Sequence, residues 1–263
     1  MIRVSNVSVS LGRNRIVEDV SFDAQAGAFT VIVGPNGSGK TTLMRALSGD
    51  LPHEGVISIN SMPINRLKLW QMATMRAILP QSTSLSFPFT VREIVKLGMT
   101  SGRSGASRHN VDTLPDEALE RVDLAGFGGR FYQELSGGEQ QRVQLARVLC
   151  QVWQPVLDGQ PRFLFLDEPV SSLDLKHQLI IMQIARDFAD RGGGVIAILH
   201  DLNLTSMFAD RVVVMHRGRA DSVGTPTEVL TDDRILRVYE CALKVGGLPG
   251  KSVPFVLPQS AVL

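Results

Sequence analysis

Apolar and polar positions alternate near the start of the chain. One alternating run spans residues 2–9, a second spans 16–22 after a turn at 12–14, and a third spans 55–60. A period of two is typical of strands that bury one face. These three runs therefore predict an antiparallel β layer beside the main sheet.

Other apolar runs are continuous rather than alternating, and polar or helix-compatible stretches separate them. They lie at 30–33, 77–79, 163–167, 195–199 and 211–215. Strands buried on both faces, as in a parallel sheet covered by helices, have this continuous pattern. Helix-compatible stretches lie at 41–47, 65–74, 175–191 and 202–208, and a further helix starts at 225–228. Predicted strands and helices thus alternate along the chain, which predicts an α/β fold with a mainly parallel sheet.

Residues 82–157 differ from the rest, because helical patterns dominate. Thr90 and Glu93 have the spacing of a capping box before an apolar helix face, and 115–124 and 137–152 also read as helices. Exposed loops are expected at 82–88 and 100–110. We predict one domain over 1–263, in which 1–81 and 158–263 form the core with its antiparallel layer and 82–157 form a helical subdomain.

Composition adds limits on partners and environment. Lys plus Arg number 27 and Asp plus Glu number 26, a formal net charge of +1, which argues against nucleic acid as the main partner. Cys150 and Cys241 have no metal-ligand spacing, and both are expected to be reduced core residues. The N-terminus leads into a strand pattern rather than a signal peptide, and no apolar run approaches the ~20 residues of a membrane span.

The segment from Gly34 to Thr41 reads GPNGSGKT and fits the phosphate-loop pattern G-x-x-x-x-G-K-[ST]. A predicted strand precedes it and a predicted helix follows it, which is the context that the motif requires. Its glycines let backbone N–H groups approach an anion at a helix N-terminus. Lys40 would reach the β- and γ-phosphates, and the Thr41 hydroxyl would ligate Mg²⁺. A glycine-rich turn that matches by chance is the alternative.

Two acids, Asp167 and Glu168, lie at the end of the strand predicted at 163–167. Beside a phosphate loop, one carboxylate can hold Mg²⁺ directly or through water, and the other can accept a proton from an attacking water. The alternative is a pair of acids that begins an exposed loop and binds nothing. The presence of the phosphate loop favours the functional interpretation.

A second glycine pair lies in the sequence LSGGE, from Leu135 to Glu139. Ser136 and Glu139 form a capping box, which alone explains a helix start. It does not explain two glycines in the first turn, where each lowers helix stability by up to about 1 kcal/mol relative to Ala. Exposed N–H groups at a helix N-terminus suit an anion, so we predict a second phosphate-contacting surface.

Taken together, these motifs resemble the ATPase subunit of an ABC transporter, and the resemblance covers nearly the whole chain. It rests on residues 34–41, Gln81, 135–139, Asp167 with Glu168, 171–174 and His200, in the order and approximate spacing of that family. The resemblance implies the ABC ATPase version of the P-loop NTPase fold, with ATP and Mg²⁺ as cofactors. It also implies a head-to-tail dimer of two copies that encloses two ATP molecules.

The resemblance assigns roles by position. The candidate catalytic residues are Glu168 as general base, His200 as the residue that holds the γ-phosphate and water, and Gln81 as the sensor that links the site to the helical insert. The candidate metal ligands are Thr41, Gln81 and Asp167. The candidate nucleotide-binding residues are Gly34, Pro35, Asn36, Gly37, Ser38, Gly39, Lys40, Thr41 and Thr42, with Ser136, Gly138 and Asp174 reaching the nucleotide or the partner across the dimer interface.

One position departs from the family pattern. The family usually stacks an aromatic residue on the adenine just before the first turn glycine, where this chain has Leu11 before Gly12. Leu11 or Val17 could supply an apolar contact instead, with a loss of up to ~1–3 kcal/mol of stacking. We therefore expect weaker base discrimination and better competition by GTP.

Several segments resemble a narrower group, the ATPases of haemin importers. They are 153–155 with 158–162, 174–178 and 200–203, whereas 87–95 resembles the wider group of importers for iron chelates, haem and cobalamin. This resemblance implies a peripheral subunit on the cytoplasmic face of the inner membrane, which drives haem uptake through a two-copy integral membrane permease. A periplasmic haem-binding protein would be an indirect partner, and residues 87–92 are candidates for contact with the permease.

Other functions stay open at this point. An importer for ferric siderophores or cobalamin is the nearest alternative. A DNA-directed ABC ATPase would need a coiled-coil insertion or a basic face, and the interval from Lys40 to Asp167 has no heptad repeats. A P-loop kinase or GTPase would lack the LSGGE sequence and a histidine placed like His200.

Overall fold

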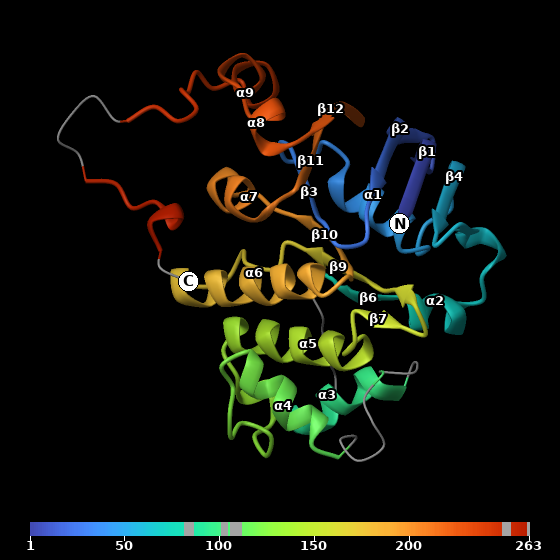
Figure 1. The fold of residues 1–263 in the computed structure, drawn as a ribbon, viewed down its shortest axis with the longest axis vertical. Coiled ribbons are helices and arrows are strands. Elements are labelled where there is room, and N and C mark those ends of the chain that lie inside the picture. The colour runs from blue at the N-terminus through green and yellow to red at the C-terminus, as the bar shows by residue number, and fades with distance from the viewer. Residues whose placement is uncertain (82–86, 101–104, 106–111, 249–253, 262–263) are drawn as a thin grey trace.

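The computed structural model describes residues 1–81, 87–100, 105, 112–248 and 254–261. Most of the loop expected at 100–110, most of the loop at 82–88 and part of the C-terminal tail lie outside the described residues. Within them, a six-stranded sheet, a four-stranded sheet, a two-stranded hairpin and a group of helices build the molecule (Figure 1).

The larger sheet has six strands and is parallel except at one edge. Its order is β12 (Arg219–Gly224), β11 (Arg211–His216), β3 (Phe29–Val33), β10 (Gly194–Ile198), β9 (Phe163–Asp167) and β6 (Arg76–Leu79). Only the β11–β12 pair is antiparallel. The smaller sheet has the order β2 (Asn14–Ala24), β1 (Ile2–Leu11), β4 (Glu54–Ile59) and β5 (Met62–Pro63), and its pairs are antiparallel. The predicted fold class, a mainly parallel sheet with an antiparallel layer and helices, is confirmed.

The described helices fall into three groups along the chain. Those before the insert are α1 (Lys40–Leu47), the 3₁₀ turn Ile64–Arg66 and α2 (Leu69–Met75). Those between β6 and β9 are α3 (Val91–Thr100), α4 (Leu114–Arg121), the 3₁₀ turn Tyr132–Glu134 and α5 (Gly137–Gln151), followed by the hairpin β7 (Val156–Leu157) and β8 (Gln160–Pro161). Those after β9 are α6 (Leu175–Asp190), α7 (Leu202–Phe208), α8 (Pro226–Val229), α9 (Asp232–Tyr239) and the 3₁₀ turn Pro258–Ser260.

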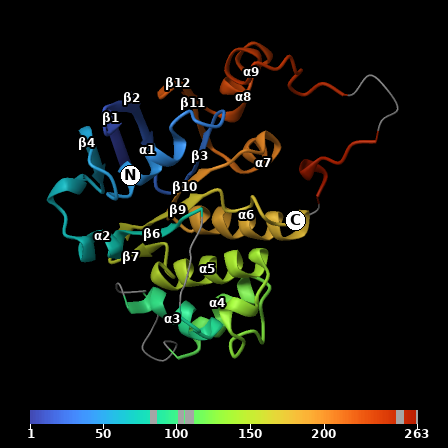
Figure 2. The same ribbon diagram turned by 180° about the vertical axis from the view of Figure 1, so that it is seen from behind.

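Both faces of the parallel sheet are buried, as continuous apolar strands predict. In β9, Leu164 and Leu166 belong to the core shared with α4, α5 and α6, whereas Phe163 and Phe165 belong to the core shared with α1 and the antiparallel sheet. Successive strand residues point to opposite faces, so each strand contributes to both cores. The parallel sheet thereby lies between the antiparallel layer and the α3–α6 helices, which the views from both sides show (Figure 1, Figure 2).

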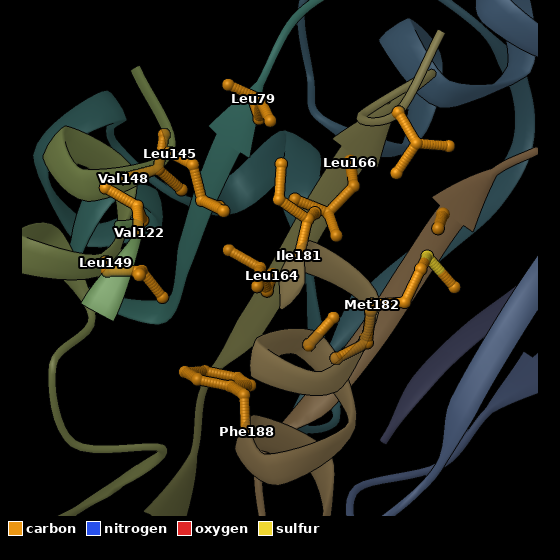
Figure 3. Close-up of a cluster of buried hydrophobic side chains, with 14 of the residues drawn as sticks. Leu79, Val122, Leu145, Val148, Leu149, Leu164, Leu166, Ile181, Met182 and Phe188 are labelled. Atoms are coloured by element: carbon orange, nitrogen blue, oxygen red, sulfur yellow. The ribbon is translucent and has the colours of Figure 1, made fainter. Parts of the chain in front are cut away.

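The core on the helical side joins the insert to the sheet. Figure 3 shows Leu79 of β6 and Leu166 of β9 close to Leu145 of α5 and Ile181 of α6. One buried apolar cluster therefore continues from the sheet into α3, α4 and α5. The three helices lie together (Figure 1), but the boundaries of the helical subdomain at 82 and 157 stay a prediction.

Some local expectations were wrong. The helix expected over 65–74 is divided, because Leu67 and Lys68 have extended backbone angles between the 3₁₀ turn and α2. Cys150 is buried as expected, but Cys241 is exposed and is no core residue. The sequence pattern also missed the edge strand β12, whose residues are mostly half-buried and partly polar, and the short helix α9.

Candidate nucleotide-binding site

The phosphate loop connects β3 to α1, as predicted. Gly34, Gly37 and Gly39 have φ angles of +149°, +75° and +96°, which side chains with a Cβ rarely adopt. A Cβ on Gly34 would overlap the carbonyl oxygen of Met215, and a Cβ on Gly39 would lie 2.9 Å from the carbonyl oxygen of Ile16. The loop therefore needs these glycines for both its turn and its close packing.

Lys40, the first residue of α1, is held within this loop. Its Nζ donates to the carbonyl oxygens of Gly34 and Pro35, each at 2.9 Å. Burial lowers the pKa of Lys40, while the charges of Glu168 and Asp167 act in the opposite direction. The ammonium group therefore lies at the mouth of the loop beside two carboxylates, where an anionic ligand can reach it.

Asp167 ends β9 and lies beside Thr41 of α1. The Thr41 hydroxyl acts to lower the pKa of the Asp167 carboxylate, whose Oδ1 is buried and accepts no hydrogen bond from any described residue. Burial first, and then the charge of Glu168, raise the pKa of Asp167 from its ordinary 3.8 to about 6. A buried, unpaired carboxylate oxygen next to a hydroxyl fits Mg²⁺, which takes one or two protein oxygens and leaves its other positions to phosphate and water. Three or more His, Cys, Asp or Glu side chains in metal-binding proximity do not occur among the described residues.

Glu168 is the centre of a side-chain cluster at the carboxyl ends of three strands. Its Oε1 lies 2.7 Å from Nε2 of His200, which follows β10, and its Oε2 accepts a hydrogen bond of 2.9 Å from Nε2 of Gln81, which follows β6. Ligands of open α/β sheets bind at this strand edge. The three candidate catalytic residues are thus brought together beside the phosphate loop.

A cleft of about 710 Å³ contains this cluster. Its lining consists of Leu11, Ile16, Asn36, Gly37, Gly39, Lys40, Thr41, Thr42, Gln81, Glu168 and His200. Leu11 and Ile16, from the β1–β2 hairpin, form an apolar wall. The alternative contact residue Val17 is wrong, because its side chain is fully buried in the core. Ile16 was the position to consider, since it precedes Val17 in an alternating strand and so points to the opposite face.

The remaining candidate residues lie elsewhere. Pro35 and Ser38 line a smaller hollow of about 290 Å³ behind the loop, with Tyr239 of α9. Ser136 begins α5 and forms the predicted capping box, with its main-chain N and Oγ 2.8 and 2.7 Å from Oε2 of Glu139. Ser136, Gly138 and Asp174 are not part of the cleft lining, so one copy of the chain does not bring them to the phosphate loop.

Asp174 has contacts within its own chain. Its Oδ1 accepts a hydrogen bond of 2.9 Å from the main-chain N of His177 and so caps α6, and both carboxylate oxygens lie 2.8 Å from Nδ1 of the same histidine. On the other side of this ring, Nε2 lies 3.3 Å from Oδ2 of Asp123. The hydrogen bond from the main-chain N–H of His177, and then the one from its side chain, lower the pKa of Asp174.

Comparison with known proteins gives a consistent result. A family described as ABC transporter matches residues 17–171, more than half of the chain. The hemin import ATP-binding protein HmuV of Mesorhizobium japonicum is 65% identical over 262 residues, with both chains covered completely. Its namesake from Rhizobium meliloti is 58% identical over 264 residues, again with complete coverage of both chains.

The chain belongs to the ABC transporter family. As an ATP-binding subunit of this family it is an ATPase. Among solved structures, a dimeric bacterial ABC transporter cassette has a TM-score of 0.73 at 26% identity, covering 86% of this chain and 99% of that one. Among the described residues of this ABC subunit, no helix combines the length and hydrophobicity needed to cross a bilayer.

Proposed function

We propose that this ABC ATPase energises the uptake of haem (haemin) across the inner membrane, as a peripheral subunit on its cytoplasmic face. The observation that supports haem as the transported molecule is the full-length identity of up to 65% with relatives named for hemin import. The observation that supports the energy source is the cleft in which Lys40 and Glu168 lie together.

Within one copy, the phosphate loop binds the nucleotide, and the residues at the strand ends bind Mg²⁺ and activate water. In this proposal the loop of residues 34–42 binds the phosphates, with Asn36, Gly37 and 39–42 lining the cleft, and Leu11 with Ile16 contact the base. Thr41, Asp167 and Gln81 would hold Mg²⁺, which supplies charge neutralisation at the phosphates. Glu168 accepts a proton from the attacking water, and His200 holds the carboxylate and the water in place.

Two copies complete the site in this proposal. Ser136 and Gly138 lie at the exposed start of α5, outside the cleft of their own chain. Helix N-termini bind anions through free N–H groups and the helix dipole. In a head-to-tail dimer, the start of α5 in one copy faces the nucleotide held by the phosphate loop of the other, and the Asp174 segment lines the same interface.

A surface near α3 is the proposed contact with the two-copy permease. Phe87 is 70% exposed and packs edge-on to Phe89, with ring centroids 6.3 Å apart. Arg92 is less available, because its Nε lies 3.1 Å from Oδ2 of Asp116. We therefore assign the contact to the Phe87 side of the 87–92 segment.

The test uses the subunit assembled in lipid with the permease encoded beside it. Its ATP turnover is measured with a haem-loaded periplasmic binding protein, with the same protein free of haem, and with binding proteins loaded with ferric siderophore or cobalamin. Stimulation by the haem-loaded protein alone is expected. If another loaded protein stimulates turnover instead, the transported molecule is that protein's ligand and not haem, and the role as an ATPase still holds.

A further inference from the structure

The side chain of Gln141 connects α5 to the main chain of Glu168. Gln141 lies in the second turn of α5, and its Nε2 donates to the carbonyl oxygen of Glu168 at 3.1 Å. A carbonyl oxygen only accepts, so the contact fixes which end of the amide points at it. The amide Oε1 is buried and accepts no hydrogen bond in the part of the chain that the structure describes.

The backbone of Glu168 needs such support. Its φ angle is +52°, in the left-handed region that non-glycine residues occupy only when their surroundings hold them there. The same carbonyl oxygen accepts from Oγ of Ser171 at 3.2 Å, within the local turn. Gln141 contacts the main chain of Glu168 from another element, whereas Gln81 and His200 contact its carboxylate.

The start of the same helix carries Ser136 and Gly138. At about 1.5 Å of rise per residue, Ser136 lies only about 7–8 Å along the axis from Gln141. Gly138 packs so closely on the segment after Glu168 that an added Cβ would lie 3.0 Å from Cδ2 of Leu173. A shift of the helix start would therefore move the Gln141 amide as well.

There is room for such a shift. A hollow of about 180 Å³ lies between the Gln81 end of β6 and the first turns of α5. Gln81, Gly137 and Gln141 are among its lining residues. The helix start is therefore not packed solidly against the strand end on this side.

We propose that Gln141 is a positioning residue, which couples the start of α5 to the placement of Glu168. The inference rests on the proposed head-to-tail dimer and on Glu168 as the general base. In that dimer, the start of α5 contacts the nucleotide bound to the partner copy, while Gln141 holds Glu168 at the nucleotide of its own copy. Closure on one ATP thus sets the base at the other.

The test compares Gln141→Met with Gln144→Met in the full chain. Both substitutions keep the length of the side chain on α5 and remove an amide, but Gln144 donates to the hydroxyl of Tyr132 at 3.2 Å and does not touch Glu168. For Gln141→Met we expect kcat for ATP to fall about five- to tenfold, the effect of one lost hydrogen bond of the usual strength. The Kd for ATP of the isolated subunit should change less than twofold, and Gln144→Met should keep kcat near the wild-type value.

A second comparison distinguishes mispositioning of Glu168 from a general weakening of the dimer. The double variant Glu168→Gln with Gln141→Met should form the ATP-bound dimer at the same ATP concentration as Glu168→Gln alone. The proposal is overturned if kcat of Gln141→Met stays within twofold of wild type, or if kcat and ATP affinity fall together. If Glu168→Gln alone hydrolyses ATP at the wild-type rate, Glu168 is not the general base, and this proposal fails with that assignment.

Discussion

Nε2 of His200 lies 2.7 Å from Oε1 of Glu168, although the two residues are 32 positions apart and follow different strands. With Glu168 ionised, the contact requires the tautomer of His200 that carries its proton on Nε2. The His200 side chain is 42% exposed and that of Glu168 only 14%, so the histidine is the more solvent-accessible member of the pair, and both line the cleft. In the proposed mechanism, this contact orients the carboxylate that accepts a proton from the attacking water.

Replacing His200 by Ala should remove this orientation without unfolding the protein, because the side chain is largely exposed. We expect kcat for ATP to fall about a hundredfold, the loss that a misplaced reacting group can cause. ATP binding to the isolated subunit should change little. An ATP affinity that falls as much as kcat would instead assign His200 to ground-state binding.

Asp167 should make stability depend on pH. Its pKa is raised to about 6, so the folded protein holds this proton more tightly than the unfolded chain does. The free energy of unfolding therefore decreases as the pH rises from about 4 to above 6. The full shift corresponds to about 3 kcal/mol, and we expect about 1–2 kcal/mol because solvent in the cleft screens part of it.

The measurement is chemical denaturation of wild type and Asp167→Asn without nucleotide or Mg²⁺. The variant should be the more stable protein at neutral pH, and its advantage should shrink as the pH falls toward 4. Comparing the two proteins cancels the titration of groups that they share. An advantage that stays constant with pH would contradict the cause given for the raised pKa.

The start of α5 gives a prediction with a matched control. Ser136→Arg should abolish ATP turnover, because a long side chain would block the partner's nucleotide, and the lost cap costs only about 1 kcal/mol of stability. Ser136→Asp can still accept from the main-chain N of Glu139 but places a negative charge beside Oε2 of Glu139, so it should also abolish turnover and lower the melting temperature moderately. Turnover by Ser136→Asp would argue against an anion at this position.

Base recognition is expected to be weak, since Leu11 and Ile16 are the apolar side chains in the cleft lining. Leu11 is 43% exposed, so an aromatic ring has space there. Leu11→Tyr should tighten ATP binding about five- to tenfold through stacking, toward the lower end of the usual range. In wild type, GTP should compete with labelled ATP nearly as well as unlabelled ATP does. Strong rejection of GTP by wild type would contradict this account.

The sequence was informative where local chemistry decides structure. The glycines of 34–39 and the acids after the 163–167 run could be placed from spacing alone, because the strand–loop–helix context is local. Val17 was proposed as a base contact although it faces the core, and Cys241 was expected inside although it is exposed. Both predictions failed because the burial of a side chain depends on how the elements pack against one another.

Long-range contacts were beyond sequence reasoning. Nothing in the spacing shows that Gln141 reaches the carbonyl oxygen of Glu168, 27 positions away, or that His177 lies between Asp174 and Asp123. These contacts follow from how α5 and α6 pack on the sheet. β12 was missed because edge strands need less hydrophobicity than central ones.

The most direct test of the account is the Glu168→Gln variant with saturating MgATP. Its molecular mass is followed by light scattering, and phosphate release is measured on the same sample. We predict a stable dimer that retains ATP and releases almost no phosphate, while wild type hydrolyses ATP and returns to its starting mass. A variant that stays monomeric would contradict the head-to-tail dimer, and wild-type phosphate release would contradict Glu168 as the base.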